Sequence, residues 1–315
     1  MSNEITVVNR EQLPVKAVIF DVEQAKQAFD LLPITETTRN DYKERVGDFI
    51  EFIQINGVGV NTLLDYRRHL ESRTDYSIST KNKYFTTAKR YLGVLFNAHL
   101  LPMDISKDIS GQDIKGFKQS KKHKKDGVSE DEIERLAEYF RGLADTNENR
   151  RLKAIFSLLI YQGLRQVEIT RLDVSDLDLK AGKAFIRGKG RDDKEPIALH
   201  PYTVQAIKDY LLAYNKKSGA LFTCESNKQH GERLTTRSIR RLVKDVLTAL
   251  DIENSTHGFR HYFTTNLIKN YNGDLLKVAH YTRHRSLEML QVYNDQLNAE
   301  QDLPNYINAF SEVKL

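Results

Sequence analysis

The chain has a single cysteine and no long apolar run. Cys224 cannot form an internal disulfide, so a disulfide-stapled secreted domain is excluded. No stretch reaches the roughly eighteen apolar residues of a membrane-spanning helix, and the opening MSNEITVVNREQ lacks the charged and then apolar layout of an export signal. The absence of an internal repeat argues against a solenoid fold. These absences predict a soluble protein of the cytoplasm without a membrane partner.

Positive charge is modest in total but locally concentrated. The 315 residues are long for one core and favour two domains. The formal charge is +5 and the isoelectric point about 9.0, which permits a polyanionic partner without requiring one. Six lysines nevertheless fall within eleven residues: Lys115, Lys118, Lys121, Lys122, Lys124 and Lys125. Such clusters matter more for phosphate binding than the total charge does.

Three amphipathic helices are predicted in the first third of the chain. The first runs from Thr38, which is placed to cap it, to a stop at Asn56-Gly57, and the second spans 61–73. The third spans about 79–100, and its polar face carries four basic residues: Lys81, Lys83, Lys89 and Arg90. From charge alone, this face is either a solvated helix surface or a contact for phosphates.

A polar, lysine-rich stretch from Ser106 to Gly127 has the composition of a linker. Ser129 and Glu132 then form a capping-box pattern that opens a second, mostly helical half. Two helical domains joined by a basic strap would suit a clamp around a rod-like polyanion.

The second half contains one predicted β-hairpin among helices. Apolar and polar residues alternate in the segment KAFIRGKGRDDKEPIALH. The alternation stops at Gly188 and Gly190 and then resumes, which indicates a hairpin. Four helices are expected after it, at about 236–250, 258–271, 274–281 and 286–293. The first of them carries a basic run: Arg237, Arg240 and Arg241. A short terminal amphipathic helix docks either on a neighbouring copy or on its own domain; its apolar residues are Leu303, Tyr306, Ile307 and Phe310.

Two cationic side chains of this half are candidates for phosphate chemistry. Gly163 ends an apolar helix, and Arg165 and Glu168 lie three residues apart on one face of the next helix. They form either a surface ion pair or an inward-pointing guanidinium held by a carboxylate, which would preorganise a phosphate ligand. Lys189, at the hairpin tip, is either solvated or able to give a proton to a ligand under the turn. Its GKG lacks the spacing of a nucleotide-binding P-loop.

HGFRH places His257 and Arg260 one helical turn apart, so that ring and guanidinium can face the same phosphate. A zinc site using His257 and His261 would need a third ligand and, for hydrolysis, the glutamate of H-E-x-x-H, which is missing. Ser255 or Thr256 is placed to cap this helix, whose positive end favours an anion.

Tyr293 follows His284 by nine residues. Read alone, it is a core or surface tyrosine, one of fifteen in the chain. A phenol with an ordinary pKa near 10 is a poor nucleophile unaided. Cationic neighbours would lower its pKa and so favour the anionic form. The candidate neighbours are Arg165, Arg260, His257 and His284.

Together these segments resemble the motifs of the tyrosine recombinase family, the phage integrase group. QGLRQVE is similar to T-G-[LM]-R-x-x-E, GKG to the family's hairpin G-K-G, and HGFRHYFTT to H-x-L-R-H-x-F-x-T. TRHRSLEMLQVY is similar to L-G-H followed nine residues later by tyrosine. The resemblance covers nearly the whole chain. Each motif alone is weak, but the four in order are specific.

The resemblance implies a mainly α, two-domain tyrosine-recombinase-like fold. A helical core-binding domain is expected to precede a mixed α/β catalytic domain with a small antiparallel hairpin. The implied divisions are an N-terminal extension at 1–35, a SAM-like core-binding DNA-binding domain at 36–108, a basic linker at 109–127, a catalytic domain at 128–300 and a C-terminal amphipathic tail at 301–315.

The family's activity is site-specific DNA recombination through a 3′-phosphotyrosyl intermediate. Tyr293 is the implied nucleophile and Glu168 a supporting acid. Five residues are implied around the scissile phosphate: Arg165, Lys189, His257, Arg260 and His284. Lys189 is the expected acid for the departing 5′ hydroxyl and His257 the expected proton acceptor. Because the phosphotyrosyl ester keeps the energy of the broken bond, no ATP is expected. Because two arginine side chains stabilise the transition state, no metal or other cofactor is expected either.

The implied partner is double-stranded DNA with inverted-repeat sites, bound by a homotetramer that exchanges its terminal helix between subunits. The expected DNA contacts are Lys81, Lys83, Lys89, Arg90, Lys121, Lys122, Lys124, Lys125, Arg237, Arg240 and Arg241. Little precedes Thr35, so no extra arm-site domain is expected. The implied setting is a mobile element, as its integrase or resolvase, with the protein at the nucleoid.

Some residues depart from the family pattern. Gln162 stands where threonine is usual, and Thr282-Arg283 stands where Leu-Gly usually precedes His284. Because Arg283 adds bulk and charge at a turn near the phosphate, a second function stays open: a DNA-binding transcriptional regulator, repressor-like, with weak or lost cleavage. A type IB topoisomerase shares the chemistry but needs no paired sites.

Overall fold

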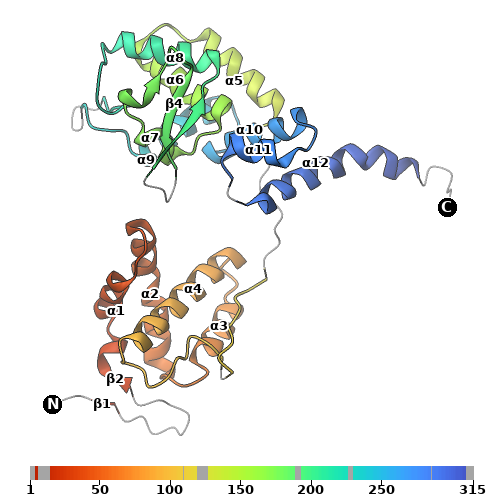
Figure 1. Ribbon diagram of the computed structural model, residues 1–315. Coiled ribbons are helices and arrows are strands. Elements are labelled where there is room, and N and C mark those ends of the chain that lie inside the picture. The colour runs from red at the N-terminus through yellow and green to blue at the C-terminus, as the bar shows by residue number, and fades with distance from the viewer. Residues whose placement is uncertain are drawn as a thin grey trace. The chain divides into compact units, whose positions relative to one another are not determined.

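The computed structural model describes residues 4–5, 15–108, 110–118, 127–188, 193–225, 230–284 and 286–309 (Figure 1). The chain divides into two compact units, an N-terminal unit, Met1–Ser120, and a C-terminal unit, Lys121–Leu315. The division falls inside the stretch whose composition predicts a linker. Each unit has its own hydrophobic core, and no helix in the described part of the chain is long and apolar enough to span a membrane.

The N-terminal unit is built from helices. In chain order its elements are β1 (Glu4–Ile5), β2 (Val15–Lys16), η1 (Ala17–Phe20), α1 (Val22–Ala28), η2 (Phe29–Leu31), α2 (Glu36–Asn56), α3 (Thr62–Ser72) and α4 (Ile78–Asn97). The three predicted amphipathic helices are confirmed as α2, α3 and α4. Thr38 was the wrong cap: α2 begins one turn earlier, and Thr35 accepts a hydrogen bond from the backbone N–H of Thr38 at 3.4 Å.

The core of this unit reaches further toward the N-terminus than residue 36. Ile19, Ala25 and Phe29 are fully or almost fully buried with the apolar residues of α2 and α4. The hydroxyl of Tyr91 in α4 donates to the carbonyl of Ile19 at 2.8 Å. The segment expected to be an extension therefore supplies part of the packing, because its apolar residues cover the α2 and α4 surfaces.

The C-terminal unit combines helices with one small sheet. Its elements are α5 (Glu130–Gly142), α6 (Asn147–Gln162), α7 (Gln166–Arg171), η3 (Val174–Asp176), β3 (Leu177–Asp178), β4 (Lys183–Arg187), β5 (Lys194–Ala198), α8 (Pro201–Ala213), α9 (Thr236–Ala249), α10 (Thr256–Asn270), α11 (Leu275–Thr282) and α12 (Leu287–Asn308). The capping box of Ser129 and Glu132 is confirmed at the start of α5. The predicted hairpin is confirmed as β4 and β5, paired antiparallel, with β3 on the other side of β4.

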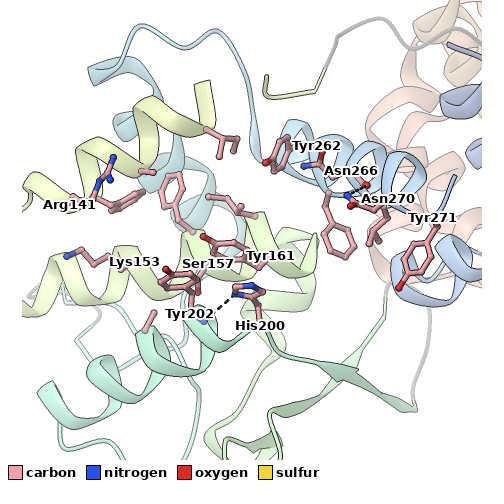
Figure 2. Close-up of a pocket in the computed structure, with 18 residues that line it drawn as sticks. Arg141, Lys153, Ser157, Tyr161, His200, Tyr202, Tyr262, Asn266, Asn270 and Tyr271 are labelled. Carbon is pink, nitrogen blue, oxygen red and sulfur yellow. Dashed lines mark hydrogen bonds between the residues drawn. The ribbon is translucent and has the colours of Figure 1, made fainter. Parts of the chain in front are cut away.

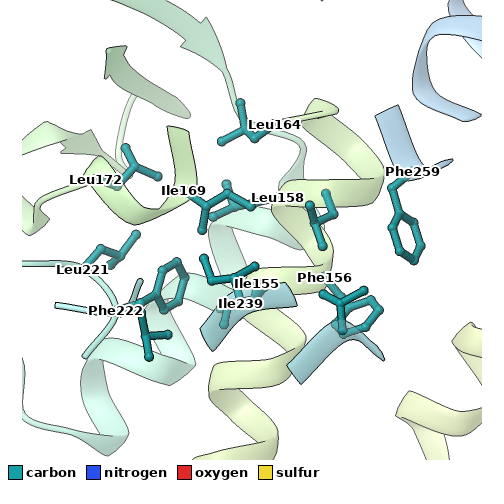
Figure 3. Packing of buried hydrophobic residues seen from close by; sticks show 14 of the residues in the cluster. Ile155, Phe156, Leu158, Leu164, Ile169, Leu172, Leu221, Phe222, Ile239 and Phe259 are labelled. Carbon is teal, nitrogen blue, oxygen red and sulfur yellow. The ribbon is translucent and has the colours of Figure 1, made fainter. Parts of the chain in front are cut away.

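Helix α6 forms the centre of the C-terminal core. Figure 3 shows Ile155, Phe156 and Leu158 of α6 among side chains from α7, α9, α10 and the loop before α9. Burying each such side chain stabilises the fold by about 1.5–3 kcal/mol relative to leaving it exposed. This packing holds the turn between α6 and α7, from which the first site residues project, against α10.

A smaller apolar cluster joins α10, α11 and α12. Its buried members are Ile268, Val278, Leu290, Tyr293 and Leu297. The predicted helix at 286–293 and the separate terminal helix were wrong, because α12 is one continuous helix of 22 residues. No glycine or proline interrupts the chain before Pro304, which lies inside the helix.

Candidate active site

Gly163 makes the turn on which the site depends. It ends α6 in the left-handed conformation, with φ 56°, which glycine adopts without steric cost. A Cβ at this position would lie 2.4 Å from Cδ1 of Phe263 in α10, so the close approach of the two segments also requires glycine. The carbonyl of Gly163 accepts a hydrogen bond from Nη1 of Arg260 at 2.8 Å.

Arg165 and Glu168 pair as predicted at the start of α7. Nη1 of Arg165 donates to Oε1 of Glu168 at 2.9 Å, and the Arg165 backbone N–H donates to Oε2 at 2.8 Å. The Glu168 side chain is 1% exposed and that of Arg165 33%. Burial raises the pKa of Glu168, but the charge of Arg283 and the Arg165 backbone N–H outweigh it, so the net pKa is lowered and the carboxylate stays ionised.

Arg260 is almost completely buried, with 3% of its surface exposed. Besides its bond to Gly163, its Nη2 donates to the carbonyl of Thr282 at 2.5 Å. Burial, followed by the charges of Arg165 and Arg283, lowers the pKa of Arg260 to about 9. The guanidinium therefore stays charged at neutral pH, fixed by two carbonyls from other parts of the chain.

His257 and His261 lie one turn apart on α10, which Ser255 caps. His257 is exposed and His261 is buried, with ring centroids 5.2 Å apart. The His261 ring in turn meets the Tyr293 ring edge-on at 4.7 Å. From the sequence, His261 was interpreted only as a possible zinc ligand. Its position four residues after His257 and next to Arg260 could have identified it as part of the site.

Tyr293 belongs to this unit's own core. It is 6% exposed, packed in the small cluster of α10, α11 and α12. Burial raises its pKa to about 12, and the charge of Arg260 opposes this only in part. The expected lowering of this pKa was wrong for the protein without DNA, because burial of the phenol outweighs the neighbouring cations. The phenol is neutral at pH 7 and needs a proton acceptor to react.

His284 lies two residues after the end of α11. Its Nδ1 lies 2.7 Å from the hydroxyl of Thr282. Burial, then the charges of Arg260 and Arg165, lower the pKa of His284 to about 3, so the ring is neutral at pH 7.

Arg283 adopts the left-handed conformation that ends α11, with φ 58°. Its side chain is 6% exposed, and its Nη2 donates to Oε2 of Glu168 at 3.0 Å. The departure from the family's usual glycine is thus accommodated. Its contact with Glu168 was not foreseen, because the two residues lie 115 positions apart.

The other predicted site residues are distributed as follows. Lys189, Lys121, Lys122, Lys124 and Lys125 lie outside the described residues. On α4, Lys83 and Arg90 are exposed, whereas Lys81 donates to the Glu71 carbonyl at 2.8 Å and Lys89 pairs with Asp113. Three exposed arginines lie on α9: Arg237, Arg240 and Arg241.

The C-terminal unit thus concentrates positive charge around a neutral tyrosine and a neutral histidine. Arg165, Arg260, Arg283 and His257 all lie near enough to lower the pKa of His284. Rigid guanidinium groups of this kind bind and stabilise a phosphoryl group without a metal. Within the described ranges, no three histidine, cysteine, aspartate or glutamate side chains are grouped so that they could hold a metal ion.

The chain is similar to several known recombinases. The model of the phage integrase family matches residues 127–300. Tyrosine recombinase XerD of Oceanobacillus iheyensis is 30% identical over 285 residues, which cover 79% of this chain and 92% of that protein. Tyrosine recombinase XerC of Staphylococcus aureus strain JH9 is 26% identical over 272 residues, 80% of this chain and 89% of that protein.

Two solved structures share the fold. The XerH site-specific recombinase bound to its palindromic difH substrate, in a post-cleavage complex, aligns with a TM-score of 0.66 at 18% identity, over 93% of this chain and 84% of that one. The Tn1549 transposon integrase in complex with transposon right end DNA aligns with a TM-score of 0.59 at 15% identity, over 88% of this chain and 98% of that one. Because the family model matches more than half of the chain, the protein belongs to the phage integrase family of tyrosine recombinases and is a site-specific DNA recombinase.

Proposed function

We propose that Tyr293 is the nucleophile of this recombinase. Its hydroxyl oxygen attacks the scissile phosphorus, the bond from phosphorus to the 5′ oxygen breaks, and a 3′-phosphotyrosyl ester forms. The phenolic proton goes to His257, and the departing 5′ oxygen takes a proton from Lys189. In the reverse step, a 5′ hydroxyl of another strand attacks the ester, so that rejoining needs no ATP.

Arg165 and Arg260 stabilise the charge that develops on the nonbridging oxygens, and His284 donates a hydrogen bond to one of them. Glu168 positions Arg165. The roles of the two arginines are supported by their fixation: each is held by groups of the protein before DNA arrives, so little reorganisation is needed in the transition state.

One observation carries this proposal. Arg260 is bonded to carbonyls 97 and 22 residues away along the chain, and its charge acts on Tyr293. A buried arginine, a neutral tyrosine and His261 in contact with that tyrosine are therefore in place within one unit. A buried guanidinium whose charge acts on a tyrosine favours a cleaving recombinase over a regulator that only binds DNA.

The same proposal extends to how DNA is held. We infer that 36–108, together with the segment from Ile19 to Phe29 that packs into its core, is the core-binding domain, and that 109–127 links it to the catalytic domain 128–300. DNA phosphates then meet the basic residues named above on α4, the linker and α9. The exposure of Lys83, Arg90 and the three α9 arginines supports this inference. Lys81 and Lys89 would have to exchange an internal partner for a phosphate.

Assembly into a tetramer through the terminal helix is also part of the proposal. The last turns of α12 project away from the other helices of the C-terminal unit (Figure 1) and expose Leu303, Tyr306 and Ile307 by 52%, 63% and 59%. In the same unit, a cavity of about 970 Å³ opens between α5, α6, α8 and α10. Its lining is largely apolar and includes Phe140, Phe156 and Phe263. The exposed apolar face of α12 from a second copy can bind there.

The rim of this cavity is polar and aromatic. Figure 2 shows Tyr161, His200 and Tyr202 gathered at one side, with centroids of Tyr161 and His200 4.4 Å apart in a stacked arrangement. Arg141 and Lys153 lie at the left of the view, and Asn270 and Tyr271 lie at the right. An apolar floor with a polar rim is the usual composition of a protein interface.

The DNA site and its setting follow from the same family relationship. We propose paired inverted-repeat sites and a mobile element whose integrase or resolvase this is, acting at the nucleoid. The palindromic substrate of XerH and the transposon end bound by the Tn1549 integrase support these two points.

The test is covalent trapping on a suicide substrate. DNA flanking the gene is nicked beside each candidate cleavage position, so that the released fragment diffuses away and the phosphotyrosyl adduct accumulates. We expect an adduct with the natural protein and none with Tyr293→Phe, which should keep its affinity because only a hydroxyl is removed. Tight binding of the natural protein without any adduct would instead identify a regulator.

A further inference from the structure

Arg283 occupies a backbone position that disfavours an ordinary side chain. Its φ of 58° lies in the left-handed region, where a Cβ approaches the following carbonyl oxygen. Its backbone N–H donates to the Ala279 carbonyl at 2.8 Å and closes α11. Glycine would make this turn without strain, whereas the arginine side chain adds an interaction that glycine lacks.

That interaction is with two carboxylates from different elements. Nη2 of Arg283 lies 3.0 Å from Oε2 of Glu168, at the start of α7. Its Nε lies 3.5 Å from Oε1 of Glu195, in β5, an ion pair without a hydrogen bond. Nη1 donates back to the carbonyl of Tyr281 at 3.3 Å. A single planar guanidinium therefore links α7, β5 and the end of α11.

Glu168 divides its two oxygens between two arginines. Oε1 accepts from Nη1 of Arg165, and Oε2 accepts from the Arg165 backbone and from Arg283. With 1% of its surface exposed, this carboxylate has no room to rotate toward water. Its orientation, and through it that of the Arg165 guanidinium, depends on Arg283.

The residues on either side of Arg283 are tied to the site as well. The Thr282 carbonyl accepts from Arg260, and the Thr282 hydroxyl contacts Nδ1 of His284. Anchoring Arg283 to α7 and β5 therefore also fixes the peptide that presents His284. Two neighbouring residues, Thr282 and Arg283, thus contact three site residues, Arg260, Glu168 and His284, which is not expected of a surface turn.

We propose that Arg283 is a positioning residue for DNA cleavage: it locks Glu168, and with it Arg165, and holds the His284 turn against β5. The inference rests on the proposed cleavage by Tyr293 and assigns a function to the residue that departs from the family pattern. Arg283 acts through its neighbours and is not itself assigned a contact with the phosphate.

The experiment measures single-turnover cleavage and DNA affinity of the full chain on the suicide substrate. Arg283→Gly removes the guanidinium and relieves the backbone strain. We expect cleavage to slow by about 10- to 100-fold, as when a catalytic group is displaced by about 1 Å, with DNA affinity unchanged. The matched control is Asn272→Gly, which makes the same backbone change at an exposed left-handed residue, φ 48°, and should cleave at the natural rate.

Two further variants separate positioning from folding. Arg283→Lys keeps the charge but cannot fork between two carboxylates, so we expect slower cleavage with unchanged affinity even if the glycine variant does not fold. In an Arg165→Lys background, which already lacks the group that Glu168 orients, Arg283→Gly should slow cleavage much less than it does alone.

The outcomes distinguish this inference from the cleavage proposal. If the natural protein forms no adduct, both fail. If the natural protein cleaves, and both Arg283→Gly and Arg283→Lys cleave as fast as it does, only the positioning role is overturned. If Arg283→Gly causes the same loss with Arg165 present or replaced, the lock on Glu168 and Arg165 is overturned, since Arg283 and Arg165 would then act independently.

Discussion

The hydroxyl of Thr282 accepts a hydrogen bond from Nδ1 of His284. The two atoms lie 2.7 Å apart, and the same hydroxyl lies 2.8 Å from the carbonyl of Val278. A hydroxyl has one proton to donate and a carbonyl can only accept, so the Thr282 proton goes to Val278. His284 therefore carries its proton on Nδ1, and in the neutral ring Nε2 can only accept. To donate from Nε2 to a phosphate oxygen, the ring must become an imidazolium.

Binding of site DNA should therefore take up a proton through His284. Its pKa of about 3 leaves the ring neutral in the free protein, and a nearby phosphate raises that pKa because it favours the charged form. Calorimetry at pH 6, in buffers of different ionisation enthalpy, measures the uptake. We expect the natural protein to take up more protons than His284→Gln, by up to about one proton per site. Equal uptake would show that His284 does not donate to the phosphate.

The low pKa of His284 should also make the C-terminal unit sensitive to acid. In the unfolded chain the ring binds a proton near its ordinary pKa of 6.5, whereas the folded protein resists protonation down to about 3. Stability therefore falls as the pH drops from 6.5 toward 3, by up to about 1.4 kcal/mol per pH unit for a full proton. The loss of melting temperature between pH 7.5 and pH 5 should be smaller in His284→Gln. An identical loss would contradict the burial of a neutral ring.

Gly163→Ala should destabilise the protein and impair cleavage together. The new Cβ would lie 2.4 Å from Phe263, in a left-handed backbone with φ 56°. We expect a cost of about 1–2 kcal/mol for the backbone and about 1–3 kcal/mol for overpacking. Displacement of the Gly163 carbonyl also removes a partner of Arg260 and slows cleavage.

Gly182→Ala is the matched control for this change. Its φ is 63°, and the nearest atom to its Cβ would be the Leu199 carbonyl oxygen at 3.8 Å. It should show only the backbone cost and keep the natural cleavage rate. Denaturant melts and adduct formation on the suicide substrate measure both effects, and equal destabilisation in the two variants would exclude the steric argument.

Lys189→Ala should slow cleavage in a way that depends on the leaving group. Loss of a general acid costs about 10²- to 10⁴-fold in rate. Sulfur in place of the bridging 5′ oxygen should restore the rate, because a thiolate leaves without first gaining a proton. Tyr293→Phe should stay inactive on the same sulfur substrate. A Lys189→Ala defect that sulfur does not repair would assign the lysine to another role.

Charge on the last turns of α12 should prevent assembly on paired sites. Leu303→Glu combined with Ile307→Glu places two carboxylates on the exposed apolar face, where entry into an apolar cavity becomes unfavourable. Sedimentation with two-site DNA should then show dimers or monomers in place of tetramers. The control is Asn298→Glu, an exposed position earlier on the same helix. Unchanged tetramers in the double variant would rule out the terminal helix as the contact.

Local signals in the sequence predicted much of the fold correctly. The capping box of Ser129 and Glu132, the hairpin around 183–198 and the stop at Gly163 all depend on contacts within a few residues. The wrong prediction of the α2 cap concerns a position where two nearby residues could each cap the helix. Thr35 and Thr38 can both cap α2; in the structure Thr35 does so, where the preceding segment packs Phe29 into the core.

The sequence by itself determined the chemistry available to this protein: two arginines, a lysine, two histidines and a tyrosine in motifs whose order is typical of one family. The tertiary structure decided the protonation states and the contacts of these side chains. Burial, which depends on packing across the whole unit, sets the pKa of Tyr293 at about 12 and that of His284 at about 3. Likewise, the link from Arg283 to Glu168 exists only because folding brings together residues 115 positions apart, and no local pattern in the sequence encodes such a distance.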